Sequence, residues 1–166
     1  LNKQQNISSK KDINTIKSAI RRTNLKDTEN QWFALTKRAR VVVYNPDNVK
    51  AEDLSTYEAL TDDKWKNKIL IRSSSNIYNQ SLMASIIANS DEVSAIKWAE
   101  GIVVNMARTP KGNDRDQIKA VVAGEGDLAV VNTYYIGKLL NSKNADEVKA
   151  GEGIKVFFPN QEGRGT

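Results

Sequence analysis

The sequence predicts an α/β fold in which a mainly parallel sheet is flanked by helices. Two observations support this prediction. The strand candidates are continuous apolar runs, and they alternate along the chain with segments whose apolar residues recur every three or four positions. Strands buried on both faces read as continuous apolar runs, and helical crossovers are what join parallel strands. Ligands of such sheets bind beyond the carboxyl ends of the strands, next to helix N-termini.

Four apolar runs are the expected strands. The first, Arg40-Val41-Val42-Val43-Tyr44, is ended by Asn45-Pro46-Asp47, which are residues typical of a turn. The second opens into a serine-rich stretch, the third follows the turn Gly124-Glu125-Gly126, and the fourth ends at Pro159. The expected strands are residues 40–44, 68–72, 127–131 and 154–158.

Helical spacing of apolar residues, together with capping residues, defines the expected helices. Near the N-terminus, Asp12 is a candidate N-cap, and Ile13, Ile16 and Ile20 share one helix face. No apolar run in the sequence approaches the roughly 20 residues that a membrane-spanning helix needs. The expected helices are residues 12–22, 55–60, 80–88, 92–105, 114–123 and 133–140.

The composition excludes several kinds of chemistry. The 166 residues contain no cysteine and no histidine, which rules out catalytic triads with a histidine base, zinc fingers and histidine-ligated metal sites within this chain. Any metal bound here is therefore held by oxygen. Lysine and arginine number 25 against 20 acidic residues, a net charge of +5. The densest basic cluster, Lys37-Arg38-Ala39-Arg40, runs directly into an apolar strand, so a nucleic-acid-binding module is a weak alternative.

Two segments share one pattern: an apolar strand, then small polar residues, then tyrosine, then a helix. One contains Tyr78, and the other contains Tyr134 and Tyr135. If the two strands are parallel, both turns lie at the same edge of the sheet, and the three phenols meet there. Three phenolates match the charge of Fe(III), although an unperturbed phenol has a pKa of about 10 and needs a strongly polarising metal to lose its proton. The alternative is that these tyrosines are packing residues with surface hydroxyls.

Further polar residues near these turns have two interpretations each. Ser73, Ser74 and Ser75 either bind an anion at a helix N-terminus or cap the following helix with their hydroxyls, and Asn76 after them is a further candidate for contact with an anion. Asn113 or Asp114 is a candidate N-cap, and Arg115 is either a cation beside a ligand or an exposed residue of a helix start. Arg38 and Arg40 either pair with an anion in a cleft or are solvated at the start of a strand.

Six segments in order resemble one known family, the periplasmic ferric-iron-binding proteins. These are substrate-binding components of bacterial iron(III) ABC transporters and include the iron-deficiency-induced protein A type. The resemblance extends from Asn30 to Thr166, and its most specific segments are Tyr134-Tyr135 and Asn76-Ile77-Tyr78-Asn79-Gln80. The matching segments are residues 31–45, 71–80, 111–116, 124–127, 132–135 and 157–161.

The resemblance implies a periplasmic-binding-protein-like fold, a two-lobed clamp that binds iron(III) between α/β lobes. It implies Tyr78, Tyr134 and Tyr135 as phenolate ligands, with Arg38 or Arg40 beside a synergistic anion such as carbonate. It also implies a periplasmic transport protein that catalyses no reaction, binds no nucleic acid and delivers iron to an ABC transporter permease in the inner membrane. Family members add a histidine or tyrosine ligand from an early motif that this chain lacks.

Family members are longer and their lobes are discontinuous, so the resemblance implies that this chain is a central piece. Residues 1–40 would then belong largely to the N-terminal lobe and the hinge approach, 41–157 to the C-terminal lobe, and 158–166 to the return crossing. The first residues lack the features of a signal peptide. An open sheet edge would favour pairing with a second copy, which leaves the oligomeric state open. The main alternative is a lobe that binds an oxyanion or another small solute through residues 73–76 and Arg115.

Overall fold

The computed structural model describes residues 27–29, 31–32 and 38–161. The chain divides into two compact units, Leu1–Lys37 and Arg38–Thr166. The expected helix at residues 12–22 lies outside the described residues. All the elements named below belong to the second unit.

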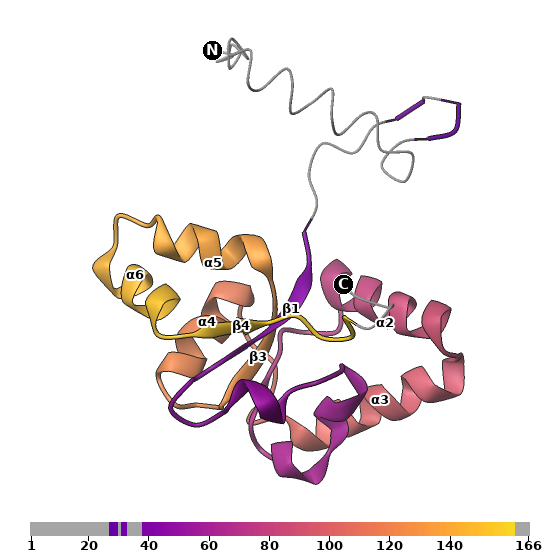
Figure 1. Ribbon diagram of the computed structural model, residues 1–166, viewed down its shortest axis with the longest axis horizontal. Helices are drawn as coiled ribbons and strands as arrows, with labels where there is room; N and C mark the ends of the chain where they lie inside the picture. The colour runs from indigo at the N-terminus through magenta and orange to yellow at the C-terminus, as the bar shows by residue number, and fades with distance from the viewer. Residues whose placement is uncertain (1–26, 30, 33–37, 162–166) are drawn as a thin grey trace. The chain divides into compact units, whose positions relative to one another are not determined.

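The second unit is built on a mixed sheet of four strands (Figure 1). Its strands, in the spatial order β2-β3-β1-β4, are β1 (Arg40–Tyr44), β2 (Ile69–Leu70), β3 (Leu128–Asn132) and β4 (Lys155–Phe157). β2 and β3 are parallel, whereas β1 is antiparallel to both β3 and β4. The α/β class is confirmed, but the expectation of a mainly parallel sheet is wrong. The connection from β1 to β2 is a stretch with three short 3-10 helices, and β1 pairs with β3 and β4 and not with β2, so no parallel βαβ unit fixes its direction.

Five α-helices of the described residues flank the sheet: α2 (Ile77–Asn89), α3 (Glu92–Asn105), α4 (Asp114–Val122), α5 (Thr133–Leu140) and α6 (Ala145–Glu152). The expected helix at 55–60 is wrong, because this region contains short 3-10 helices: η2 (Ala51–Asp53), η3 (Glu58–Thr61) and η4 (Asp63–Trp65). Helix α6 was not expected, and its clearest sequence signal is the cap Asn144, which accepts hydrogen bonds from two backbone N–H groups. Across the described residues, no helix is both long and apolar enough to cross a membrane.

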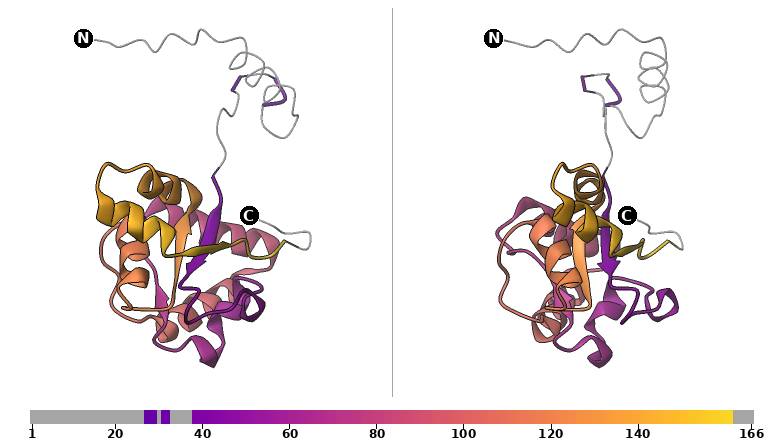
Figure 2. Two further views of the ribbon diagram at one scale, coloured as in Figure 1. Left: turned by 60° about the vertical axis from the view of Figure 1, so that its left-hand side comes forward. Right: turned by 90° about the vertical axis from the view of Figure 1, so that its left-hand side faces the viewer.

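Helices cover both faces of the sheet. Successive residues of a strand point to opposite faces. Accordingly, Val42 and Val130 pack in one core cluster with residues of α2 and α3, while Val41 and Val131 pack in a second cluster with residues of α4 and α5. Figures 1 and 2 show α2 and α3 on one side of the strands and α4, α5 and α6 on the other. Burial on both faces explains why the strands read as continuous apolar runs.

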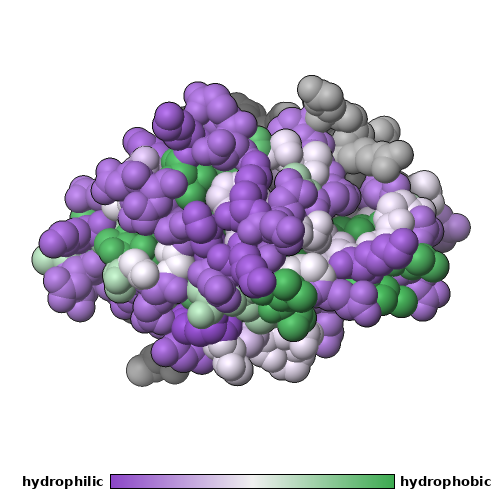
Figure 3. Space-filling view, turned by 90° about the horizontal axis from the view of Figure 1, so that it is seen from below, coloured by the Kyte–Doolittle hydropathy of each residue, from purple (hydrophilic) through white to green (hydrophobic). Residues whose placement is uncertain are grey.

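The surface mixes hydrophilic and hydrophobic side chains. Figure 3, which views the molecule from below, shows a face that is mainly hydrophilic with separate hydrophobic patches. Small interspersed patches of this kind are normal on protein surfaces. Large apolar side chains that are exposed on α2 and α3 are Ile77, Ile87, Val93, Ile96, Val103 and Val104.

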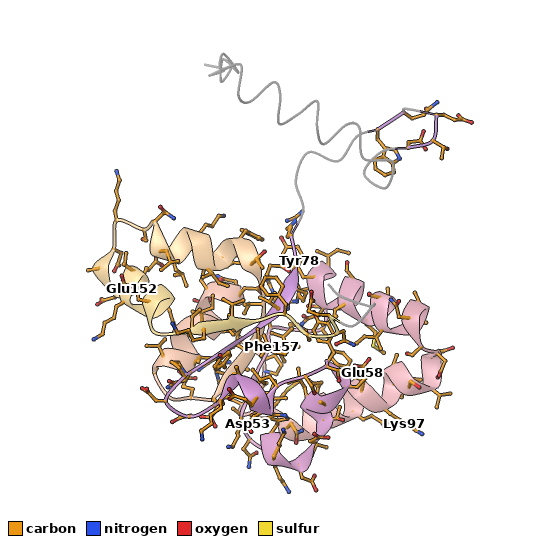
Figure 4. All side chains as sticks on the ribbon, viewed as in Figure 1. Asp53, Glu58, Tyr78, Lys97, Glu152 and Phe157 are labelled. Carbon is orange, nitrogen blue, oxygen red and sulfur yellow. The ribbon has the colours of Figure 1, made fainter. Side chains whose placement is uncertain are left out.

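The register of the strands brings three segments of the chain to one edge of the sheet. Arg40 at the start of β1 lies opposite Asn132 at the end of β3, and the parallel pairing places Leu70 of β2 opposite Ala129. The carboxyl ends of β2 and β3 therefore lie beside the start of β1, and α2 and α5 begin just beyond them. Figure 4 shows Tyr78 at this edge, next to β1 and the start of α2.

Candidate metal centre

The turn between β2 and α2 fixes the position of Tyr78. Asn76 is the N-cap of α2, and its side chain accepts a hydrogen bond of 3.0 Å from the backbone N–H of Tyr78. Asn79 fastens the loop, because its side-chain amide donates to the carbonyl oxygens of Arg72 and Ser73 at 2.7 and 3.2 Å. Tyr78 is thus held in the first turn of a helix whose start is tied to the end of β2.

The turn between β3 and α5 places Tyr134 and Tyr135 directly after Asn132 and Thr133. The backbone N–H of Thr133 donates to the carbonyl oxygen of Ala39 at 3.0 Å, and the N–H of Ala39 donates to Oγ1 of Thr133 at 3.4 Å. These reciprocal bonds join the start of α5 to the residue before β1. The ring centroids of Tyr134 and Tyr135 are 4.1 Å apart, with an angle of 31° between the ring planes.

The two turns bring their phenols together. The hydroxyl oxygens of Tyr78 and Tyr134 are 3.2 Å apart, although 56 residues separate them in the chain. All three tyrosines of the turns are partly buried, and Tyr135 also packs against the core on the side of α4 and α5. We call Tyr78, Tyr134 and Tyr135 the tyrosine cluster. Its arrangement follows from the parallel pairing of β2 and β3, which places the ends of both strands, and so both turns, at the same edge of the sheet.

Positive side chains surround the tyrosine cluster. Arg38 donates to the hydroxyl of Tyr78 at 3.4 Å, and its guanidinium carbon lies 5.6 and 5.7 Å from the ring centroids of Tyr78 and Tyr134. The guanidinium carbon of Arg72 lies 5.6 Å from the Tyr78 ring centroid, and the ammonium nitrogen of Lys138 lies 5.1 Å from that of Tyr134. Nearby cations favour the charged form of a phenol, and at Tyr78 the charges of Arg38 and Arg72 help to lower the pKa.

The surroundings shift the pKa values of two phenols in opposite directions. The pKa of Tyr78 is lowered, chiefly by the hydrogen bond with Tyr134 and further by the charges of Arg38 and Arg72. The pKa of Tyr134 is raised, chiefly by burial and then by hydrogen bonds and charge interactions with the neighbouring phenols. Tyr78 is therefore easier to deprotonate, and Tyr134 needs a more strongly polarising cation.

A fully buried carboxylate adjoins this edge. Asp114, the first residue of α4, forms ion pairs with Arg40 at 2.7 Å and Arg72 at 3.3 Å, and it accepts a hydrogen bond of 2.7 Å from the backbone N–H of Asn132. Burial lowers the pKa of Arg40, and the charge of Asp114 opposes this effect. The interpretation of Arg40 as a solvated strand start is thus wrong, because its two amino groups bond to Asp114 and Asn79 inside the protein.

Two other candidate residues serve as helix caps. The side chain of Asn113 accepts a hydrogen bond of 2.8 Å from the backbone N–H of Arg115 at the start of α4. The capping interpretation is confirmed for Asn113, whereas the expectation that serine hydroxyls cap α2 is wrong, because the side chain of Asn76 is the cap. The hydroxyl of Ser73 lies 2.8 Å from that of Ser75, so these serines bond to each other within the loop. Their role toward an anion stays a prediction.

Sequence reasoning missed four charged or polar residues that support the tyrosine cluster. Arg72 carried a usable signal, because it ends the expected strand 68–72 at the ligand edge. Asp114 carried none, because its burial depends on how α4 packs against the sheet. Arg115, which was predicted, lies where its charge helps to lower the pKa of Glu147, after the stronger effects of Lys119 and Ser142. The missed residues are Arg72, Asn79, Asp114 and Lys138.

Comparison with known proteins reveals clear relatives. Residues 2–163 match the family model of the bacterial extracellular solute-binding proteins. The chain is 53% identical over 155 residues to Iron uptake protein A1 of Synechocystis sp., an overlap of 91% of this chain and 43% of that protein. It is 30% identical over 118 residues to the major ferric iron-binding protein of Neisseria gonorrhoeae, an overlap of 70% and 35%. This chain thus spans less than half the length of these curated relatives.

Solved structures share the arrangement of this chain. A Trichodesmium protein (IdiA, FutA) in complex with iron and citrate ligands superimposes with a TM-score of 0.84 at 49% sequence identity. The ferric binding protein from Campylobacter jejuni superimposes with a TM-score of 0.83 at 44% identity. Each likeness covers 96% of this chain and 49% of the other chain.

Proposed function

The chain belongs to the family of bacterial extracellular solute-binding proteins and has a periplasmic-binding-protein-like fold, and on that premise we propose that it binds ferric iron through tyrosine phenolates. Its relatives are named for iron uptake and for ferric iron binding. The observation that carries the proposal is the meeting of phenols from two separate turns, with the hydroxyls of Tyr78 and Tyr134 3.2 Å apart.

The donor chemistry of the tyrosine cluster suits Fe(III) as the transported substrate. Phenolates are hard anionic oxygen donors, and three of them neutralise a trivalent ion. Calcium and magnesium are bound more often by carboxylates and carbonyls. Within the part of the chain that the structure describes, no group of three or more acidic side chains could hold a metal ion. The phenols are therefore the candidate anionic ligands of this region.

Binding exchanges protons for the metal ion. Each phenol loses its proton when its oxygen bonds to iron, so proton release accompanies binding. Tyr78, whose pKa is lowered, gives up its proton more readily than Tyr134, whose pKa is raised. Fe(III) is polarising enough to ionise both.

The cations at this edge support a synergistic anion such as carbonate beside the iron. Once three phenolates have neutralised Fe(III), the charges of Arg38 and Lys138 remain next to the tyrosine cluster. Arg38 is the better candidate to contact the anion, because the amino groups of Arg40 are already bonded to other residues.

For the whole protein, the proposal is a two-lobed clamp in the periplasm. Residues 41–157 form the C-terminal lobe, while residues 1–40 and 158–166 belong largely to the other lobe and the hinge crossings. The second lobe supplies the remaining ligand and closes on the ion, because closure needs contacts that only the closed state makes. An ABC transporter permease then recognises the closed form. The protein carries iron without converting it chemically.

Equilibrium competition for Fe(III) against citrate tests the proposal. We expect the triple variant Tyr78→Phe, Tyr134→Phe, Tyr135→Phe to lose the ability to take iron from citrate. Tyr44→Phe is the matched control. It removes the phenolic hydroxyl of a buried residue at the other end of β1 and should leave the affinity for iron unchanged. A triple variant that unfolds cooperatively and still binds iron with full affinity would contradict the proposal.

An anion-binding lobe is the second candidate, and one observation favours it. A groove of about 430 Å³ is lined by the exposed Arg38 and by the polar side chains of Tyr78, Ser81, Ser85 and Asn132. A thermal shift with sulfate that exceeds the shift with iron would support this candidate. The nucleic-acid-binding alternative has less support, since Arg40 of the basic cluster is buried in an ion pair and is not available to a phosphate backbone.

A further inference from the structure

Asp114 joins the two tyrosine-bearing turns inside the protein. Its side chain is fully buried and accepts hydrogen bonds from Arg40, Arg72 and the backbone N–H of Asn132. These partners come from three different segments: Arg40 begins β1, Arg72 follows β2, and Asn132 ends β3. One carboxylate at the start of α4 therefore holds all three segments of the edge at which the phenols meet.

On one side, the contacts of Asp114 lead to Tyr78 through two arginines. Arg40 donates a further hydrogen bond to the side-chain oxygen of Asn79, the residue that follows Tyr78. Asn79 in turn donates to the carbonyl oxygen of Arg72, whose guanidinium carbon lies 5.6 Å from the Tyr78 ring centroid. The groups that fasten the turn of Tyr78 are thus the groups that Asp114 holds by charge.

On the other side, Asp114 reaches the tandem tyrosines through the backbone. It accepts the N–H of Asn132 at 2.7 Å, and α5 begins at the next residue, Thr133, with Tyr134 and Tyr135 in its first turn. Among the described residues, no side-chain cap fastens this helix start. The bond to Asp114 and the reciprocal bonds between Thr133 and Ala39 therefore anchor the end of β3 from which α5 departs.

We propose that Asp114 is a positioning residue for ferric iron, one that holds the two turns at the separation at which Tyr78 and Tyr134 can bind the same ion. The inference rests on the proposed function. Without the carboxylate, Arg40 and Arg72 would be unpaired like charges in a largely buried site. Their repulsion would move the end of β2 away from β1, and the phenols of the two turns would separate.

The alternative role for Asp114 is that of a stabilising ion pair with no bearing on the metal. Both roles predict that its removal lowers the melting temperature. They differ in the spectrum of the ferric complex, because only displaced phenolates change the charge-transfer absorbance per bound iron. The absorbance is therefore the readout that separates the two roles.

The test is a ferric citrate titration of the protein and of Asp114→Asn, below the melting temperature of both. We expect the variant to bind iron at least about tenfold more weakly, as loss of a group behind a metal ligand does. We also expect a weaker and shifted phenolate-to-iron band per bound iron. Asp116→Asn is the matched control, because it makes the same charge change in the same helix at an exposed residue that bonds to the backbone N–H of Asn113. It should keep the original affinity and band.

A second variant keeps the test decisive if Asp114→Asn does not fold. Arg72→Gln removes one of the two ion pairs and leaves the pair of Arg40 in place. We expect it to bind iron more weakly than the unaltered protein and to show a weaker and shifted band per bound iron.

Two results would overturn the inference alone: unchanged iron affinity in the folded variant, or weaker affinity with an unchanged band per bound iron. Either result would make Asp114 a stabilising residue only. A different result concerns the proposed function: if the unaltered protein shows no band with ferric citrate, the proposed function fails and the inference fails with it.

Discussion

The two tyrosine-bearing turns share one sequence pattern but provide unlike phenols. The turn of Tyr78 is fastened by side chains, because Asn76 caps the helix and Asn79 bonds to the loop. The turn of Tyr134 is fastened through its backbone, which bonds to the buried Asp114. The pKa of Tyr78 is lowered, while that of Tyr134 is raised.

This difference in pKa has causes inside and outside the shared pattern. The hydrogen bond with Tyr134 lowers the pKa of Tyr78 most, and the charges of Arg38 and Arg72 lower it further, whereas burial and the neighbouring phenols raise the pKa of Tyr134. One turn offers Tyr78, whose lowered pKa favours loss of its proton, and the other offers Tyr134, whose phenol a strongly polarising cation must ionise. A site divided in this way favours a trivalent ion over weaker cations. The local pattern sets where a phenol lies, and the tertiary surroundings set how it ionises.

The largest expected effect comes from removing both phenols of the turn between β3 and α5. Tyr134→Phe combined with Tyr135→Phe should weaken ferric iron binding by more than about 100-fold, the upper end of the loss for groups behind a metal ligand. The reason is that two anionic ligands are lost. Competition with citrate measures the affinity. If this double variant bound iron as well as Tyr78→Phe does, the two turns would not differ in the way described.

A smaller effect is expected on the pH dependence of binding. After the hydrogen bond with Tyr134, the charge of Arg38 contributes most to lowering the pKa of Tyr78. Arg38→Met should raise that pKa toward the ordinary value of about 10. Because iron binds the phenolate, protons would then compete better, and the midpoint pH of iron release should move upward.

The control for this pH experiment is Arg108→Met. Arg108 forms an ion pair with Glu125, so this substitution removes a guanidinium charge that does not belong to the surroundings of Tyr78. Its midpoint pH should match that of the unaltered protein. An equal midpoint in Arg38→Met would mean that the hydrogen bond with Tyr134 alone sets the acidity of Tyr78.

The side-chain cap beside Tyr78 can be tested with a pair of variants. Asn76→Ala removes the cap of α2, and Asn144→Ala removes the cap of α6. Each should lower the free energy of unfolding by about 1 kcal/mol, the usual cost of a lost cap. Only Asn76→Ala should also weaken iron binding, because of these two helices only α2 carries a phenol of the tyrosine cluster. Equal iron affinities of the two variants would show that the cap does not position Tyr78.

The smallest effect is expected at an ion pair between α4 and α6, outside the two tyrosine-bearing turns. The pKa of Glu147 is lowered, chiefly by its hydrogen bond with Lys119. A lowered pKa means that the carboxylate stabilises the fold above its unfolded-state pKa, and that this contribution disappears as the pH falls through the folded-state value. Glu147→Gln should therefore lower the melting temperature slightly at pH 7 and not at acidic pH. Any change in its iron affinity would be unexpected.

The parts of the fold that the sequence predicted have strong local signals. The strand Arg40–Tyr44 and the helices Glu92–Asn105 and Thr133–Leu140 have the bounds expected of them. The direction of β1 was not predictable, because an apolar run shows that a strand is buried and not which way it runs. Helix Ala145–Glu152 was missed because its apolar residues are few.

The site was predictable to a similar degree. The tyrosines could be located because each follows a strand and begins a helix, and the pairing of β2 with β3 does bring their turns together. Asp114 could not be recognised, since it reads as an exposed helix-start residue and is buried only by tertiary packing. Arg40 was misjudged for the same reason, as its ion pair joins residues that are 74 positions apart.

Visible absorption during titration with Fe(III) tests most directly the central claim, that phenols from both turns bind one ion. We predict a phenolate-to-iron charge-transfer band that reaches its plateau at equimolar iron. Tyr78→Phe and Tyr134→Phe should each alter the band, and the triple phenylalanine variant should abolish it. A band that Tyr78→Phe leaves unchanged, or the absence of any band in the unaltered protein, would contradict the account.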